Sequence, residues 1–215
     1  MKTLPAKKII LFAFFGFIFG FIPVSHALAA DLVAPQVTIE KASKQLMEKL
    51  QDEDFTKDFS KINVFVGDVI DPHVDFNRIT ALVLGKLWKK ATREEKIRFK
   101  KEFHTLLVRT YSRAFVEFKE WSVRFLPLKM KEGSRKVIVK TEILQPGIQP
   151  LAVNYRMVLT KNKWKVYDIM IEGVSLVTNY RTSIKNEYRK TGSLNAVIDQ
   201  LAKRNTAALS PKDNS

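Results

Sequence analysis

The stretch from Trp164 to Arg181, WKVYDIMIEGVSLVTNYR, constrains the fold more than any other part of the chain. Its first half alternates with a period of two, which predicts a strand with apolar side chains on both faces. The two faces are expected to carry Trp164, Val166 and Met170, and Tyr167, Ile169 and Ile171. After Gly173 the apolar residues return at helical spacing. A strand covered on both faces should therefore turn sharply into a helix and bring large apolar groups to that junction.

The rest of the chain predicts helices, then strands, then helices again. Helices are expected at residues 35–50, 59–69, 76–90, 93–119, 174–189 and 193–205. Strands are expected at residues 123–128, 136–144, 151–160 and 164–171. The turns between these strands are short enough for an antiparallel meander. This order predicts a single α+β domain, residues 30–209, in which helices wrap a twisted antiparallel sheet of about four strands.

Two helix starts carry capping signals. Asp75 is a plausible N-cap for the helix that begins at Phe76, and Thr92 with Glu95 forms a capping box. Gly85 lies inside the expected helix 76–90, where glycine costs about 1 kcal/mol relative to alanine. We therefore expect close packing against another element at Gly85.

The N-terminus has the features of a secretory signal. Lysines precede an apolar run from Ile9 to Ile22, and Ala27-Leu28-Ala29 matches a cleavage site. Because that run is shorter than the roughly 20 residues needed to span a bilayer, cleavage near Ala29 is favoured over a membrane anchor. We expect residues 1–29 to be removed, the product to be periplasmic, and residues 210–215 to be disordered.

Charge and cysteine content exclude several classes of function. The chain has no cysteine, which excludes disulfides, thiol chemistry and a lipoprotein anchor. Its formal charge is +15, or +12 without the three lysines of the signal. In the cytoplasm such a charge would indicate nucleic acid, but for an exported chain we expect anionic lipid headgroups instead. A basic surface that serves only solubility is the alternative.

The sequence shows no catalytic or metal-binding motif. His73 and His104, the histidines that remain after cleavage, lack metal-ligand spacing, and there is no G-x-S-x-G, dinucleotide or phosphate-loop motif. His104 is expected in solvent and His73 in a hydrogen-bonded loop. Asp168 is expected to cap a helix or form an ion pair rather than act as a base. The sequence therefore predicts neither an enzyme nor a bound cofactor.

Large apolar residues are more numerous than a simple core requires. Those on the long helix, the last two strands and the turn after Gly173 could converge between helix and sheet. They are Tyr111, Phe115, Val153, Tyr155, Tyr167, Ile169, Val174, Leu176 and Val177. An ordinary filled core is the alternative. The tyrosines favour the rim of a cavity, because each buried hydroxyl needs a partner or a wet edge.

Three segments carry a family resemblance: VYDIxIEGVSLVxNYR at residues 166–181, FxRxTALVLGKxW at 76–88, and FxxLLVRTYSRAF at 103–115. Together they resemble the periplasmic phospholipid-shuttle component of the Mla ABC transport system, the toluene-tolerance family. Ile184 departs from the phenylalanine that is frequent in similar sequences, which leaves the shape of any cavity open. The resemblance implies a cone like that of nuclear transport factors, with an apolar cavity for acyl chains. The carry-over of lipid-binding residues rests on Tyr111, Tyr167 and the residues from Val174 to Val177. Trp88 and Val108, which lie in the resembling segments 76–88 and 103–115, complete the expected lipid-binding residues.

The resemblance also implies function and partners. It implies a monomeric carrier that moves phospholipid between an outer-membrane lipoprotein–porin complex and an inner-membrane ABC transporter with a substrate-binding ring. Such traffic would maintain the lipid asymmetry of the outer membrane. Two alternatives stay open: an enzyme of the same cone fold acting on a small apolar substrate, and an adaptor with a filled core. The enzyme requires an acid or histidine inside its pocket, and the adaptor requires that no lipid be bound.

Overall fold

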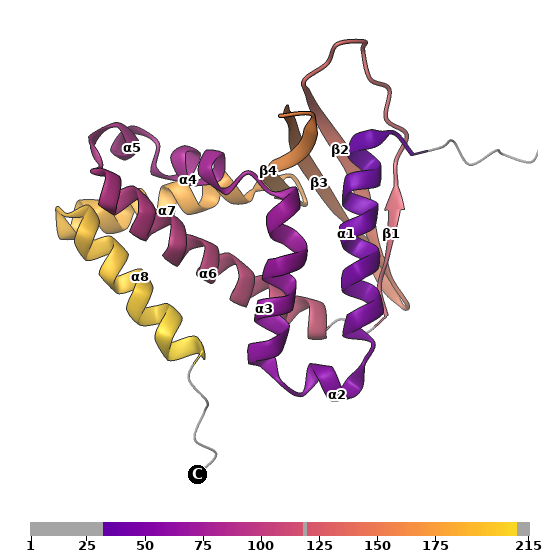
Figure 1. Ribbon diagram of the computed structural model, residues 1–215, viewed down its shortest axis with the longest axis horizontal. Coiled ribbons are helices and arrows are strands. Elements are labelled where there is room, and N and C mark those ends of the chain that lie inside the picture. The colour runs from indigo at the N-terminus through magenta and orange to yellow at the C-terminus, as the bar shows by residue number, and fades with distance from the viewer. Residues whose placement is uncertain (1–31, 118–119, 210–215) are drawn as a thin grey trace, which may run out of the picture. The chain divides into compact units, whose positions relative to one another are not determined.

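A computed structural model describes residues 32–117 and 120–209, with side chains at residues 32–114 and 120–209 (Figure 1). The expected signal (1–29), the tail (210–215) and the side chain of Phe115 lie outside these ranges. The helical elements are α1 (Ala34–Leu50), α2 (Glu53–Thr56), α3 (Phe59–Ile70), the 3-10 turn η1 (Asp71–His73), α4 (Phe76–Leu84), α5 (Lys86–Lys90), α6 (Arg93–Glu117), α7 (Leu176–Thr191) and α8 (Leu194–Leu209). The strands are β1 (Ser122–Phe125), β2 (Lys136–Gln145), β3 (Ile148–Thr160), β4 (Lys163–Ile171) and β5 (Val174–Ser175).

The strands form one antiparallel sheet in the order β1-β2-β3-β4-β5, which confirms the predicted α+β meander. The fifth strand was not predicted. Val174 pairs with Ile171, so it belongs to the sheet and not to the following helix. That helix, α7, begins at Leu176 because the Ser175 hydroxyl accepts a hydrogen bond from the backbone N–H of Thr178 at 3.1 Å.

A β-bulge in β4 makes the predicted alternation of that strand wrong. Asp168 lies opposite Arg156, but Val166, not Tyr167, lies opposite Met157. Tyr167 is therefore the extra residue of the bulge. As a result Val166 shares a face of the sheet with Ile169, whereas strict alternation placed the two on opposite faces.

The predicted helix 76–90 is two helices, α4 and α5. Gly85 separates them with φ 56° and ψ −118°, a conformation that residues with a side chain rarely adopt. The guanidinium Nε of Arg181, from α7, donates to the carbonyl oxygen of Leu82 at 2.6 Å beside this break. The predicted caps are confirmed. The Asp75 carboxylate accepts from Arg78 N–H at 3.0 Å, and Thr92 and Glu95 exchange hydrogen bonds at 2.8 and 3.1 Å.

The helices form two groups around the sheet (Figure 1). Helix α1 packs on the inner face of the sheet, against β1, β2 and β4, and α3 lies between α1 and α6. Helices α4, α6, α7 and α8 pack on one another, and this group meets the sheet through β4. None of the helices in the described ranges combines the length and apolar character that a membrane crossing requires.

Most of the buried apolar residues of the described ranges fall into three clusters. The helical cluster joins α4, α6, α7 and α8 around Phe99 and Phe103. The sheet cluster consists of Ile39, Val139, Met157 and Val166. The α3–α6 cluster consists of Leu46, Ile62, Val66 and Val108. Among the described residues, Val74 packs against both the helical and the sheet cluster and so connects the two.

Candidate functional site

The inner face of β3 and β4 carries a row of apolar residues at the edge of the sheet cluster. Val153 lies opposite Ile171, and Tyr155 lies opposite Ile169. Val153 is only 7 % exposed, yet it belongs to none of the three clusters formed by the described residues. Val139, on the same face of the neighbouring strand, is 0 % exposed and belongs to the sheet cluster. Among the described residues, the sheet cluster on this face therefore does not extend to Val153.

Tyr155 marks the border of the tightly packed region. Burial raises the pKa of its hydroxyl to about 12, while a hydrogen bond with Thr141 acts in the opposite direction. The side chain is nevertheless only half-buried. Tyr155 packs against the sheet cluster and keeps part of its surface accessible, so it lies at the edge of the packed region.

Tyr111 lies on α6, the helix that packs against α3, α4 and α8. Burial raises the pKa of Tyr111. The charge of the Tyr180 hydroxyl on α7, and a hydrogen bond with that hydroxyl, raise the pKa of Tyr111 further. Tyr180 also packs edge-on against Phe103 of the helical cluster, with ring centroids 5.1 Å apart. Tyr111 itself belongs to none of the three clusters. The sequence did not single out Tyr180 as a site residue, although its spacing of three from Val177 places both on one face of α7.

Asp168, the acid nearest this region, has a structural role. Its carboxylate is 3 % exposed and accepts hydrogen bonds from the Ser175 hydroxyl at 2.7 Å and the Val177 backbone N–H at 3.1 Å. It also pairs with Arg156 at 3.3 Å. The carboxylate thus joins β4 to the N-terminus of α7, where negative charge is favoured. The prediction of a capping and ion-pair role is confirmed.

The described residues offer no group of three or more histidine, cysteine, aspartate or glutamate side chains that could hold a metal ion. What the geometry offers is an apolar inner surface bordered by tyrosine hydroxyls. Such a surface can accept the hydrocarbon part of an amphipathic molecule and leave its polar part at the edge.

Comparison with known families agrees with the three resembling segments. The family model described as MlaC protein matches residues 40–203, which is most of the chain and includes both α6 and the β4–α7 junction. The chain belongs to the MlaC family.

Three known proteins to which the chain is similar share less than a third of its residues. The "Intermembrane phospholipid transport system binding protein MlaC" of Haemophilus influenzae is 23% identical over 191 residues, 86% of each chain. The "Toluene tolerance protein ttg2D" of Pseudomonas putida is 25% identical over 150 residues, 68% of this chain and 69% of its own length. A solved phospholipid-binding protein of Ralstonia solanacearum, in complex with a phospholipid, has a TM-score of 0.76 and 28% identity. That match covers 83% of this chain and 100% of the other.

The other residues expected to line a cavity of the MlaC type are distributed over several places. Val177 and Tyr167 pack in or against the helical cluster, and the guanidinium of Arg78 lies 5.7 Å from the centre of the Tyr167 ring. Val108 is part of the α3–α6 cluster, on the helix that also carries Tyr111. Leu176 is half-buried in the first turn of α7. These residues come from different elements and do not form one cluster.

Two expected residues lie apart from the inner surface. Val174 is 60 % exposed in the edge strand β5. Trp88 lies on α5 and packs against the helical cluster, with the ammonium of Lys96 5.1 Å from its ring centre. The structure thus brings Val153, Tyr155 and Ile169 together on the sheet, and it does not bring Trp88 or Val174 to them.

Proposed function

We propose that this chain is a phospholipid carrier that holds acyl chains between the inner face of β3–β4 and helix α6. The observation that carries the proposal is the apolar row Val153, Tyr155 and Ile169, which shares one face of the sheet and runs from the edge of the sheet cluster to a residue that joins no cluster, Val153. Support also comes from the similar Ralstonia solanacearum protein, which was solved with a phospholipid bound. Membership of the MlaC family makes the same role the expected one.

Within this proposal the residues have distinct roles. Val153 and Ile169 contact acyl chains from the sheet, and Val108 contacts them from α6. Tyr111 and Tyr155 lie at the border, where their hydroxyls reach polar partners. The further positions expected at or near the site remain Trp88, Phe115, Tyr167, Val174, Leu176 and Val177.

The energetics favour transfer during docking. Burial of acyl chains contributes about 0.8 kcal/mol per methylene, so two chains of ordinary length represent roughly 20 kcal/mol before other costs. Spontaneous release into water is then negligible, and lipid has to pass while the carrier is bound to a partner that offers another apolar surface. We propose an outer-membrane lipoprotein–porin complex and an inner-membrane ABC transporter as these partners. The carrier would act as a monomer in the periplasm and maintain the asymmetry of the outer membrane.

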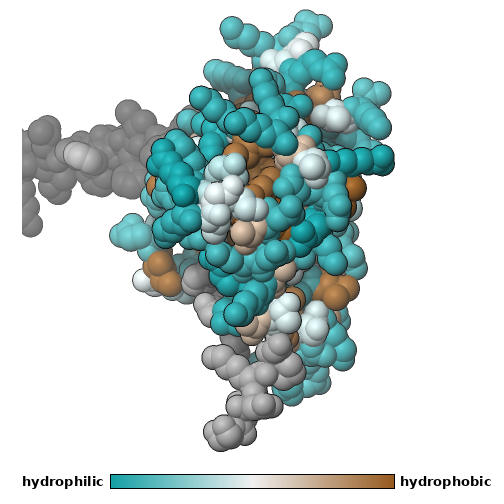
Figure 2. Space-filling model, turned by 90° about the vertical axis from the view of Figure 1, so that its left-hand side faces the viewer, coloured by the Kyte–Doolittle hydropathy of each residue, from teal (hydrophilic) through white to brown (hydrophobic). Residues whose placement is uncertain are grey.

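The surface is suited to encounters with anionic partners. The formal charge of the chain is +15. The face in Figure 2, which carries α5 and adjoining parts of the helical group, is mostly hydrophilic with small apolar areas between. Charge of this kind mainly accelerates encounter, so association with such partners should slow as ionic strength rises.

Native mass spectrometry of protein purified without detergent tests the carrier directly. We expect a mass above that of the bare chain by one or more phospholipids, and organic extraction should release the same lipids. A bare chain after purification, together with failure to take up phospholipid from vesicles, would refute the proposal and favour the adaptor with a filled core.

A further inference from the structure

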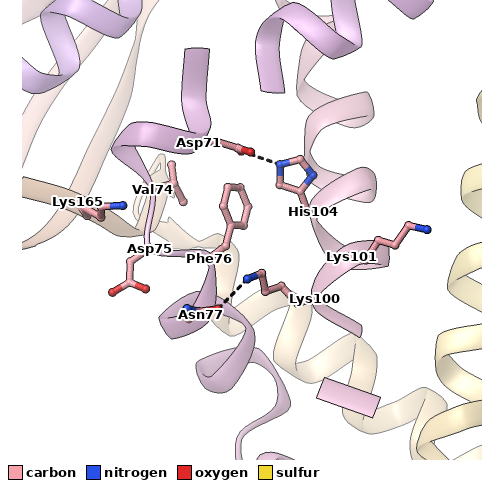
Figure 3. A pocket seen from close by; sticks show the side chains of 9 residues that line it. All are labelled: Asp71, Val74, Asp75, Phe76, Asn77, Lys100, Lys101, His104 and Lys165. Carbon is pink, nitrogen blue, oxygen red and sulfur yellow. Dashed lines mark hydrogen bonds and ion pairs between the residues drawn. The ribbon is translucent and has the colours of Figure 1, made fainter. Parts of the chain in front are cut away.

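A second pocket of about 390 Å³ opens between the start of α4, helix α6 and strand β4 (Figure 3). It differs from the apolar inner surface in that most of its lining is polar. The lining residues are Asp71, Val74, Asp75, Phe76, Asn77, Lys100, Lys101, His104 and Lys165. Three lysines and one histidine therefore contribute to the lining of a single small space.

The two acids of this pocket already have partners. The Asp71 carboxylate is 2.7 Å from Nε2 of His104. The Asp75 carboxylate caps α4 through the backbone N–H of Arg78, and it pairs with the guanidinium Nε of the same arginine at 3.3 Å. Neither carboxylate binds a lysine of the pocket.

The lysines, in contrast, retain free hydrogen-bond donors. The Lys100 ammonium donates to Oδ1 of Asn77 at 2.9 Å, a neutral acceptor that leaves two donors available. Lys165 forms no ion pair with any acid in the described ranges. Lys100 and Lys165 lie on opposite sides of the Phe76 ring, and Lys101 extends away from it (Figure 3). Because Lys100 comes from α6 and Lys165 from β4, the pocket offers ammonium groups from two of its walls.

A neighbouring histidine supports a positive field at this site. His73 precedes the pocket residue Val74 in the chain. Its pKa is lowered first by burial and then by Lys165, Lys41 and Lys163. The three lysines come from α1 and β4, so their positive charge is concentrated where these elements meet η1.

The apolar part of the pocket limits the shape of a ligand. Phe76 packs against the imidazole of His104, with ring centroids 4.6 Å apart. Val74 is held at the edge of the sheet by a parallel bridge to Val166. A ligand would thus have an anionic group between the lysines and a short organic part against Phe76 and Val74.

We propose that this pocket binds a phosphate-bearing anion, with Lys100 and Lys165 as its charged contacts. A glycerophosphate headgroup and free phosphate share this chemistry. The site is separate from the acyl-chain region, because its lining includes none of the residues that carry the proposed function. It gives the protein a means to hold a phosphate outside the apolar interior.

Titration followed by amide NMR tests the site, with two probes at pH 7 and constant ionic strength. The probes are inorganic phosphate and glycerophosphoglycerol, an acyl-free diester, and sodium chloride serves as the ionic reference. We expect saturable shifts centred on Phe76, Asn77 and His104. Binding of inorganic phosphate alone identifies free phosphate as the ligand, and equal or tighter binding of the diester identifies a headgroup. Shifts that do not saturate, or that match those caused by chloride, would overturn the proposal.

Paired charge variants supply the control. The double variant K100Q/K165Q should weaken probe binding at least tenfold. K185Q/K203Q removes the same charge from exposed positions of α7 and α8 and should change binding less than twofold. Equal weakening by both would mean that only overall charge matters, and the pocket would be rejected. Co-purified phospholipid should be unchanged in K100Q/K165Q, so the outcome is independent of the acyl-chain proposal.

Discussion

The proposal that the interior is hollow can be tested by making the same substitution at two valines on one face of the sheet. Val153 and Val139 lie on adjacent strands, and both are buried. Val139 packs in the sheet cluster, whereas Val153 belongs to no cluster. Replacement by phenylalanine adds four carbon atoms at each position. The two variants should therefore differ only in whether space for these atoms exists.

The expected magnitudes have opposite signs. In a close-packed core, overpacking of this kind costs about 1–3 kcal/mol, which is the expectation for Val139→Phe. Beside an open apolar space the added ring packs without strain. Its burial should leave Val153→Phe neutral or stabilise it by up to about 2 kcal/mol in the lipid-free protein. The free energies of unfolding of the two variants should thus differ by roughly 2 kcal/mol or more.

Urea unfolding of lipid-stripped protein measures this difference. Removal of lipid is essential, because a ligand bound only to the folded state raises its apparent stability. A difference of 2 kcal/mol corresponds to a shift in midpoint of about 1 M urea for a typical slope. Val153→Phe should also lower the amount of co-purified phospholipid, since the ring occupies space that acyl chains need. Equal destabilisation by the two substitutions, with unchanged lipid content, would refute the hollow interior.

Three further predictions concern the elements that border the site. Asp168→Ala should lower the free energy of unfolding by about 3 kcal/mol, because Arg156 loses its partner and the Val177 N–H at the start of α7 loses its acceptor. Thermal unfolding should show this loss, and an unchanged melting temperature would contradict it. Gly85→Ala should lower the free energy of unfolding by about 1–3 kcal/mol, because alanine is strained at a backbone φ of 56° even though its side chain meets no clash. A loss below about 0.5 kcal/mol, the size of an ordinary surface change, would contradict this explanation. For Tyr155, whose folded pKa is about 12 against an ordinary value of 10.0, stability is complete below pH 10 and is lost as the pH rises toward 12, by up to about 1.4 kcal/mol per unit. Urea unfolding between pH 8 and 11 should therefore show a smaller loss for Tyr155→Phe than for the unsubstituted chain, and parallel curves would refute the assignment.

Local signals in the sequence were sufficient for most of the fold. The Thr92–Glu95 capping box and the Asp75 cap depend on residues three positions apart, and both form as predicted. Period-two segments with short turns likewise led to the antiparallel meander. These features require only neighbouring residues, so a single sequence contains what determines them.

The errors in the predicted fold occur where distant residues intervene. The break at Gly85 lies beside a hydrogen bond from Arg181 to Leu82, which joins segments almost one hundred positions apart. The bulge at Tyr167 is visible only in the pairing of β4 with β3. Neither leaves a periodic signal, because glycine occurs inside helices and a bulged strand still reads as alternating over most of its length.

The candidate site was predictable in its residue types but not in its geometry. The excess of apolar residues and tyrosines indicated an apolar surface with a solvent-accessible edge. In the structure, Val153, Tyr155 and Ile169 share one face of the sheet. Whether such residues interlock depends on the distances between elements, which a pattern does not contain. The phosphate pocket had no signal at all, since Lys100 and Lys165 become neighbours only when α6 and β4 are folded.

The stretch of chain from β4 to α7 both contributes to the apolar inner face and holds α7 in place. The bulge at Tyr167 keeps Val166 and Ile169 on the inner face while Asp168 faces the other way. From there the Asp168 carboxylate holds the N-terminus of α7, and α7 in turn presents Tyr180 to Tyr111 of α6. The helix that bounds the apolar region is thus fixed by a polar contact made on the opposite face of the same strand. Because that contact lies on the other face of β4, the position of α7 does not depend on what fills the space against the apolar inner face.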